Sequence, residues 1–233
     1  IIDQPLDKNL EFLLGQVLRE SKSSWANDLA NGNLKLDSNK LFFLLKQAGI
    51  NQAVVPILRQ LREGKLEPEL LNEAINLIGQ YANQNQLKSL FQFGLSSPNQ
   101  PQVLAALANA SKSRKLSLPL GAAELSQLLN NPNGIRLAGL GKVNDLKSKV
   151  VSIAMGSENN KVELRRAAIE ALGSYSDIDT LSNLGRDTKQ PARVRRLAIS
   201  ELASQRLGLG TEIAAEFIQS VKTQIHQDEA VKL

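Results

Sequence analysis

The chain has no cysteine and only one histidine among its 233 residues. The lack of cysteine excludes a disulfide framework, a thiolate zinc site, a cysteine nucleophile and a covalently attached haem within this sequence. His226 lies close to the C-terminal end, with Asp228 and Glu229 as its near acids. We therefore expect it to be solvent-exposed rather than a metal ligand, a general base or a haem ligand. No paired-carboxylate, Ser/His/Asp or metal-ligand pattern is present, so we expect no catalytic residue, cofactor or metal.

Aromatic residues and long apolar runs are also scarce. Phe, Trp and Tyr make up 4% of the chain, too few to build a stacking platform for bases or sugars. No apolar run approaches the roughly 20 residues that span a bilayer, and the first residues lack the basic-then-apolar pattern of a signal peptide. The chain begins with Ile1 rather than Met. We therefore expect it to be a piece of a longer protein.

The charge is spread rather than concentrated. Up to residue 116 there are 13 basic and 10 acidic residues, and beyond it there are 15 and 13, for a net charge of +5. The densest basic stretch runs from Arg186 to Arg196. This mixture differs from the acid-poor ridges that bind duplex nucleic acid.

What the sequence does contain is an internal repeat. The segment 167–175 resembles the segment 73–81, including the final Gly-x-Tyr, and the two are separated by about three periods of roughly 31 residues. Weaker copies keep the same spacing, since Leu140-Gly141 precedes Leu172-Gly173 by one period and Arg195-Arg196 follows Arg165-Arg166 by one period. A fixed period of this length predicts an all-α fold, an α-solenoid of stacked antiparallel helix pairs of the HEAT-like or armadillo-like kind.

Apolar stripes of helical period, with Gly, Asn, Pro or Asp at the joints, predict helix after helix. We expect these near residues 7–22, 38–48, 52–63, 68–81, 84–95, 100–112, 121–130, 144–155, 161–174, 178–186, 191–205 and 210–226, with a short one at 134–140. Small residues occupy inward positions, so we expect close contact between helices at Ala74, Gly79, Ala168, Gly173 and Ala198. We expect a single array over residues 1–233. Within it, residues 1–35 would form an irregular N-terminal cap anchored by Trp25 and by Phe42-Phe43.

The run from Val162 to Gly173, echoed from Ala192 to Ile199, resembles HEAT-like repeats of the short bacterial type. The resemblance covers nearly all of the chain after about residue 38. It implies a fold rather than an activity, because such repeats are scaffolds in many unrelated proteins.

The opening of the chain carries a narrower resemblance. Pro5-Leu6-Asp7, Leu10-Glu11-Phe12, Trp25 and Ala30-Asn31-Gly32 resemble the start of the HEAT segment in large bacterial membrane-bound dehydrogenases. In that family a quinone-dependent β-propeller dehydrogenase module precedes the repeats and a cytochrome c module follows them. The resemblance implies an exported or periplasmic parent protein whose chemistry lies outside this chain.

Five arginines are the candidate interaction surface: Arg165, Arg166, Arg193, Arg195 and Arg196. They could form a basic ridge for phosphates, or they could pair with acids near the repeat joints, for which Asp145, Asp177 and Asp179 are available. Arg166 can also meet Glu170 four residues later on its own helix. Because Glu163, Glu170 and Glu201 accompany the arginines, the structural alternative is favoured over nucleic-acid binding.

One further motif superficially resembles a phosphate-binding loop. It is Gly139-Leu140-Gly141-Lys142, but Asn144 stands where a third glycine would be needed and no strand precedes it, so a helix–helix joint explains it better. We therefore predict a non-catalytic scaffold whose partner is a protein, either a sister module of the parent chain or a separate molecule. The alternatives are a nucleic-acid-binding array and a lyase-type repeat that acts on a chromophore protein.

Overall fold

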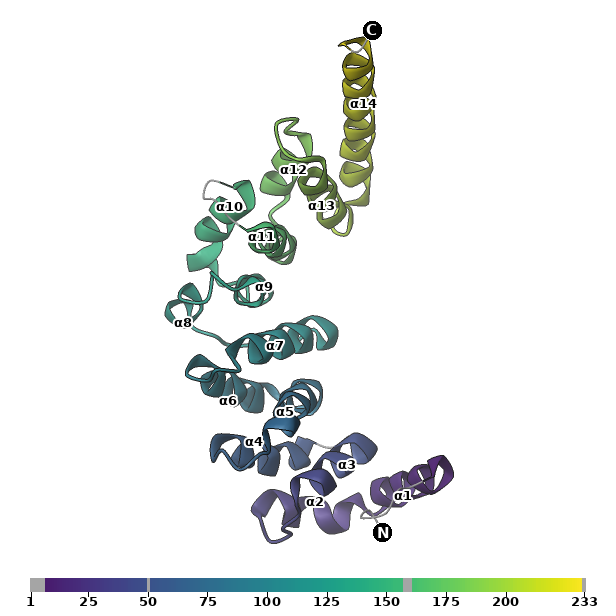
Figure 1. The fold of residues 1–233 in the computed structure, drawn as a ribbon, viewed down its shortest axis with the longest axis vertical. Helices are drawn as coiled ribbons and strands as arrows, with labels where there is room; N and C mark the ends of the chain where they lie inside the picture. The colour runs from purple at the N-terminus through teal and green to yellow at the C-terminus, as the bar shows by residue number, and fades with distance from the viewer. Residues whose placement is uncertain (1–6, 50, 157–160, 232–233) are drawn as a thin grey trace. The chain divides into compact units, whose positions relative to one another are not determined.

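Residues 7–49, 51–156 and 161–231 are described by the computed structural model, with side chains through residue 223 apart from Ala48. All regular structure within these ranges is helical. Contacts separate two compact units, Ile1–Leu118 and Pro119–Leu233. The α-helices of the first unit (Figure 1) are α1 Lys8–Glu20, α2 Lys22–Asn31, α3 Ser38–Ala48, α4 Val54–Arg62, α5 Pro68–Tyr81, α6 Gln84–Leu95 and α7 Gln100–Arg114. Those of the second unit are α8 Ala122–Ser126, α9 Pro132–Leu140, α10 Lys147–Met155, α11 Val162–Tyr175, α12 Ile178–Arg186, α13 Ala192–Ala203 and α14 Leu207–Val231.

Each unit is built from two layers of helices. In the first unit α1, α3, α5 and α7 pack on one another in order, and α2, α4 and α6 form the second layer. In the second unit α9, α11 and α13 form one series, while α10, α12 and α14 pack beside them. Neighbouring helices thus stack in sequence order within each unit, and the predicted α-solenoid is confirmed.

The repeat in the sequence is a repeat of helix positions. Helices α5 and α11 are both 14 residues long, and their starts at Pro68 and Val162 are separated by the same three periods as the repeated segments. Helix α13 begins one period after α11, at Ala192. Side-chain caps mark several helix starts, since the carboxyl or amide oxygen accepts hydrogen bonds from backbone N–H groups of the first turn. The capping residues are Asp7, Asp37, Asn83, Asn131 and Asp177.

The N-terminal segment differs from the irregular cap that the sequence suggests. Residues 8–31 form two regular helices, and α1 packs on α3 as later helices of its layer pack on theirs. Helix α2 continues past the half-buried Trp25 and ends at Gly32, whose φ of +83° suits a residue without a side chain. A terminal capping role for residues 1–35 stays a prediction.

Small residues lie where successive helices of one layer meet, α5 with α7, α9 with α11 and α11 with α13. A Cβ atom added to Gly79 would lie 3.2 Å from Ala106 on α7, and one added to Gly139 would lie 2.6 Å from the Cα atom of Ala171 on α11. A Cβ on Gly173 would collide with Glu201 on α13. The expected close approach is confirmed at Gly79, whereas Gly173 faces the side chain of Glu201. The Gly139–Lys142 motif lies at a helix joint, because α9 ends at Leu140 and Gly141 is its C-cap residue.

Polar side chains secure the ends of the same helices. Arg114 Nη1 donates to the carbonyl oxygens of Gly79 (3.1 Å) and Ala82 (2.7 Å), and the hydroxyl of Tyr175 donates to the Val143 carbonyl (2.8 Å). Gln205 Nε2 likewise donates to the Gly173 carbonyl. The last carbonyls of a helix have no partner within it, and Arg114 supplies one at the end of α5. Tyr175 and Gln205 add a second donor to carbonyls that already accept a backbone N–H. Each of these side chains lies about one repeat further along the chain.

Gly139→Ala should destabilise the fold by about 1–3 kcal/mol, because the new methyl group has no space against the backbone of α11. Gly208→Ala is the matched control, since nothing lies within 4 Å of its added Cβ. We expect that variant to be neutral or stabilised by up to about 1 kcal/mol, because alanine favours helix. Urea unfolding of both variants measures the difference, and equal stability would contradict the close-contact argument.

Burial raises the pKa of Tyr175 to about 12. Its hydroxyl should therefore stay protonated where an unfolded tyrosine, with a pKa of about 10, ionises. Because burial favours the protonated form in the folded state, the resulting stabilisation is fully present below a pH of about 10 and is lost as the pH rises toward 12. In the Tyr81→Phe variant Tyr175 is the only tyrosine of the chain. Titration of the folded variant, followed by absorbance at 295 nm, measures the pKa of Tyr175. A midpoint near 10 would contradict this burial.

Candidate functional site

The five candidate arginines do not form one surface, because Arg195 is buried. Only 6% of Arg195 is exposed. Its Nε atom donates to the Gly185 carbonyl and its Nη1 atom to Ser220 Oγ, each at 3.0 Å. The guanidinium group also lies 4.6 Å from the ring centroid of Phe217 on α14. Arg195 therefore links α12, α13 and α14 and is not available to a ligand, which corrects its place in the predicted surface.

Arg165 has a comparable structural role one repeat earlier. Its Nε atom donates to the Ala154 carbonyl at 2.8 Å and its Nη2 atom to the Met155 carbonyl at 3.3 Å, at the C-terminal end of α10. Nη2 also contacts the side-chain oxygen of Gln190. The expected partners of these two arginines were acids at the repeat joints. The structure instead gives them carbonyl oxygens at helix ends, where a cation also complements the helix dipole.

Arg166 forms the predicted ion pair. Its Nε atom lies 3.0 Å from Glu170, and Arg136 on α9 approaches the other carboxyl oxygen of Glu170 at 2.6 Å. Burial disfavours the charged form of Glu170, but the two arginines outweigh it and hold the pKa of this carboxyl below its usual value. Asp177, expected to pair with an arginine, instead caps α12 and lies 3.2 Å from Lys147.

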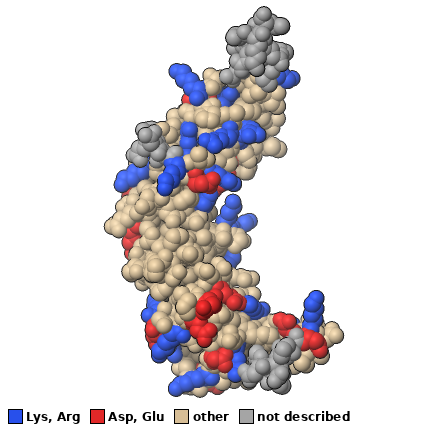
Figure 2. Space-filling model, viewed as in Figure 1, with Lys and Arg blue, Asp and Glu red and all other residues tan. Residues whose placement is uncertain are grey.

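Arg166, Arg193 and Arg196 are the exposed members of the set. Arg193 and Arg196 both lie on the solvent side of α13, three residues apart. Neither side chain forms a hydrogen bond or an ion pair with another residue of the described ranges. Figure 2 shows basic side chains gathered over the α11–α13 region on the face in view, with few acidic ones among them.

Three of the arginines come together in an open groove between the first turns of α11 and α13. The groove encloses about 360 Å³, and its lining comprises Val162, Glu163, Arg165, Arg166, Ile169, Arg193, Val194 and Leu197. Its apolar part is a strip of aliphatic side chains between guanidinium groups. We name this site the α11/α13 groove. Its size lies at the lower end of the range of about 300–1,000 Å³ for binding pockets.

The positive charge of this groove is not fully compensated. Burial lowers the pKa of Arg165, and the nearby positive charge of Arg193 lowers it further, while Asp187 acts in the opposite direction. The effect of Arg193 shows that the two guanidinium groups repel each other. An anion bound between them would relieve that repulsion.

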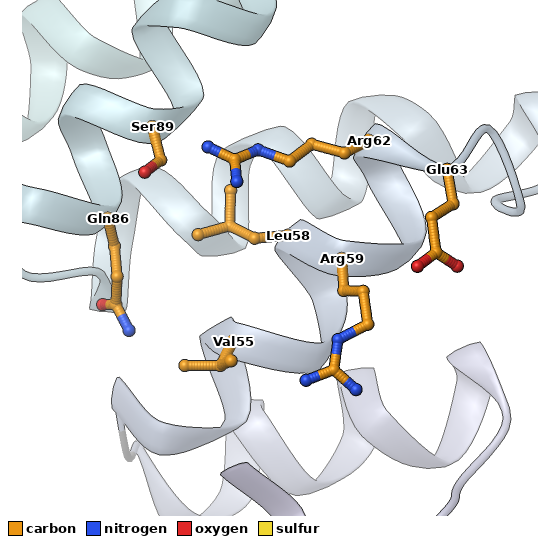
Figure 3. Close-up of a pocket in the computed structure, with 7 residues that line it drawn as sticks. All are labelled: Val55, Leu58, Arg59, Arg62, Glu63, Gln86 and Ser89. Carbon is orange, nitrogen blue, oxygen red and sulfur yellow. The ribbon is translucent and has the colours of Figure 1, made fainter. Parts of the chain in front are cut away.

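Sequence reasoning missed a second groove, between α4 and α6 (Figure 3). It also encloses about 360 Å³, and it is lined by Val55, Leu58, Arg59, Arg62, Glu63, Gln86 and Ser89. The side chain of Arg62 extends past Leu58 toward α6, whereas Arg59 extends in another direction, toward Gly32 at the end of α2. The signal available in the sequence was the spacing of Arg59 and Arg62 beside Val55 and Leu58 on one predicted helix.

The remaining candidates are His226 and the possible metal and membrane sites. The side chain of His226 lies outside the described residues. Within the described ranges, no group of three or more acidic or histidine side chains could hold a metal ion. None of the helices described is long and apolar enough to cross a membrane.

No family model, curated protein or solved structure is significantly similar to this chain. The resemblance to the HEAT segment of bacterial dehydrogenases stays a prediction that depends on the opening motif.

Arg195→Ala should destabilise the protein by about 2 kcal/mol or more, because it removes two charge-assisted hydrogen bonds and leaves the Gly185 carbonyl without that donor. Arg193→Ala should change the free energy of unfolding by no more than about 0.5 kcal/mol, because its side chain is exposed and makes no such bonds. Chemical denaturation of the two single variants tests the assignment. Equal losses would mean that the two residues do not differ in burial as described.

Proposed function

We propose that this chain is a non-catalytic scaffold that binds a protein partner, and that the α11/α13 groove is its docking surface. The observation that carries the proposal is the combination of accessible aliphatic side chains with arginines that are not fully neutralised. Val162 is 48% exposed and Leu197 is half-buried, so a partner can cover apolar area that the fold itself leaves open. Burial of such area favours association.

A protein partner fits this groove better than nucleic acid. Of the five predicted arginines, Arg195 is buried, Arg165 is bound to carbonyl oxygens, and Arg166 shares Glu170 with Arg136. Glu163 also lines the groove. A phosphate backbone requires several accessible cations without adjacent acids, whereas a peptide can use one salt bridge and an apolar contact.

The resemblance of the opening motif suggests a setting for this scaffold. In a larger exported redox protein, the segment in the groove would belong to a sister module of the same polypeptide. The scaffold proposal does not depend on that setting, since its support comes from the groove.

Selection of random twelve-residue peptides on the intact chain tests the proposal. We expect a family of peptides with micromolar affinity whose binding protects backbone amides of α11 and α13 from hydrogen exchange. Leu197→Glu, which places a charge on the groove wall, should abolish binding. Leu95→Glu, at an exposed leucine on α6, should leave it unchanged. Peptides that bind both variants equally, or a selection without binders, would overturn the proposal.

A further inference from the structure

We infer that the segment docked in the α11/α13 groove is acidic and aliphatic, with a carboxylate held by Arg193 beside an apolar side chain on the floor of the groove. This inference rests on the proposed docking function and specifies the chemistry of the partner. It assigns to Arg193 the role of specificity-determining residue.

The hydrogen-bonding state of the three groove arginines singles out Arg193. Arg165 already donates to two carbonyl oxygens of α10 and to Gln190. Arg166 is paired with Glu170 at 3.0 Å. Arg193 has no such partner among the described residues, so its guanidinium can offer a full bidentate face to a carboxylate.

The surrounding field favours an anion at this position. Arg193 is the second residue of α13, where the helix dipole adds positive potential to its own charge. The guanidinium of Arg165 is close enough for Arg193 to lower its pKa. The acids of this region are Glu163 on the groove lining, Glu170 paired with Arg166, and Asp187 near Arg165, so Arg193 is the groove arginine without an ion pair among the described residues. A basic segment placed against Arg193 would therefore meet repulsion.

The apolar floor sets the second requirement. Ile169 and Val194 are nearly buried, with 1% and 7% of their surface exposed, and they form the base between the guanidinium groups. Leu197 and Val162 provide the more accessible rims. An aliphatic side chain next to the carboxylate would cover this surface and exclude water from the salt bridge, which strengthens the ionic contact.

A second copy of the chain is the alternative occupant. Helix α1 exposes Phe12, Leu13 and Val17 and carries Glu11 and Glu20, so it combines apolar and acidic groups. Self-association through that helix would place α1 of one molecule in the groove of another. It is distinguished below by the dependence of molecular mass on concentration.

The test uses three synthetic peptides of equal length in which leucines alternate with glutamates, with glutamines or with lysines. Fluorescence anisotropy at about 150 mM salt, where exposed charges are partly screened, measures their affinity for the intact chain. We expect the glutamate peptide to bind at least tenfold more tightly than the glutamine peptide, and the lysine peptide not to bind. The affinity of the glutamate peptide should fall as salt is raised, because the ionic contact is partly exposed.

Variants of α13 assign the effect to one side chain. Arg193→Glu should weaken the glutamate peptide at least tenfold, and Arg193→Lys should restore part of the loss. Arg196→Glu is the matched control, with the same change of charge on the same helix outside the groove lining. It should change the affinity less than twofold. Circular dichroism and urea unfolding confirm that each variant is folded.

The outcomes separate this inference from the proposed function. Equal binding of the glutamate and glutamine peptides, unaffected by Arg193→Glu but abolished by Leu197→Glu, would overturn the acidic preference and leave the docking groove in place. Equal losses of affinity in Arg193→Glu and Arg196→Glu would reduce the effect to general charge attraction and overturn the role of Arg193.

Analytical ultracentrifugation tests self-association. A concentration-dependent dimer that Arg193→Glu abolishes would mean that the occupant of the groove is a second copy of the chain and not a segment of another protein. Failure of all three peptides would overturn the inference, and the peptide selection would then decide whether the groove binds protein at all.

Discussion

Contact between small residues of successive inner helices is the constraint on which each unit depends. Gly139 meets the backbone of Ala171 with no room for a methyl group, Gly79 meets Ala106 so closely that a methyl group would require a small shift, and Gly173 meets the side chain of Glu201. Isolated helices as short as these are marginal in water, and these contacts are part of the packing that stabilises them. Side chains from the next repeat also donate to carbonyl groups near the helix ends, as Arg114 and Gln205 do.

The α11/α13 groove follows from the same constraint. The two helices run in the same direction, and they come together near their C-terminal halves, where Gly173 faces Glu201. Their N-terminal halves carry the bulky side chains that line the groove, Arg165 and Ile169 on one helix and Arg193 on the other. The groove therefore lies between two helices one repeat apart, and no loop or insertion lines it.

Periodicity in the sequence predicted most of the helices but did not predict the groove. The segments 38–48, 68–81, 84–95 and 178–186 are helical between the residues that the sequence predicted, because apolar spacing and caps are local signals. Helix α2, Lys22–Asn31, was missed because the apolar pattern that predicts a helix near residues 7–22 does not continue through Trp25. Grooves between helices depend on pairs of segments that lie a full repeat apart, and one helix alone does not reveal their depth.

The arginines show most clearly where a sequence repeat loses its predictive value. Arg165 and Arg195 are equivalent in the repeat, and each donates to the C-terminal end of the preceding helix. Yet Arg195 is covered by α14 through Phe217 and Ser220, whereas Arg165 remains on the wall of an open groove. The two residues share a local motif and differ only in what the next helix places over them. The same substitution at the two positions should therefore affect different properties, stability at Arg195 and both stability and binding at Arg165, because only Arg165 borders a surface that a partner can reach.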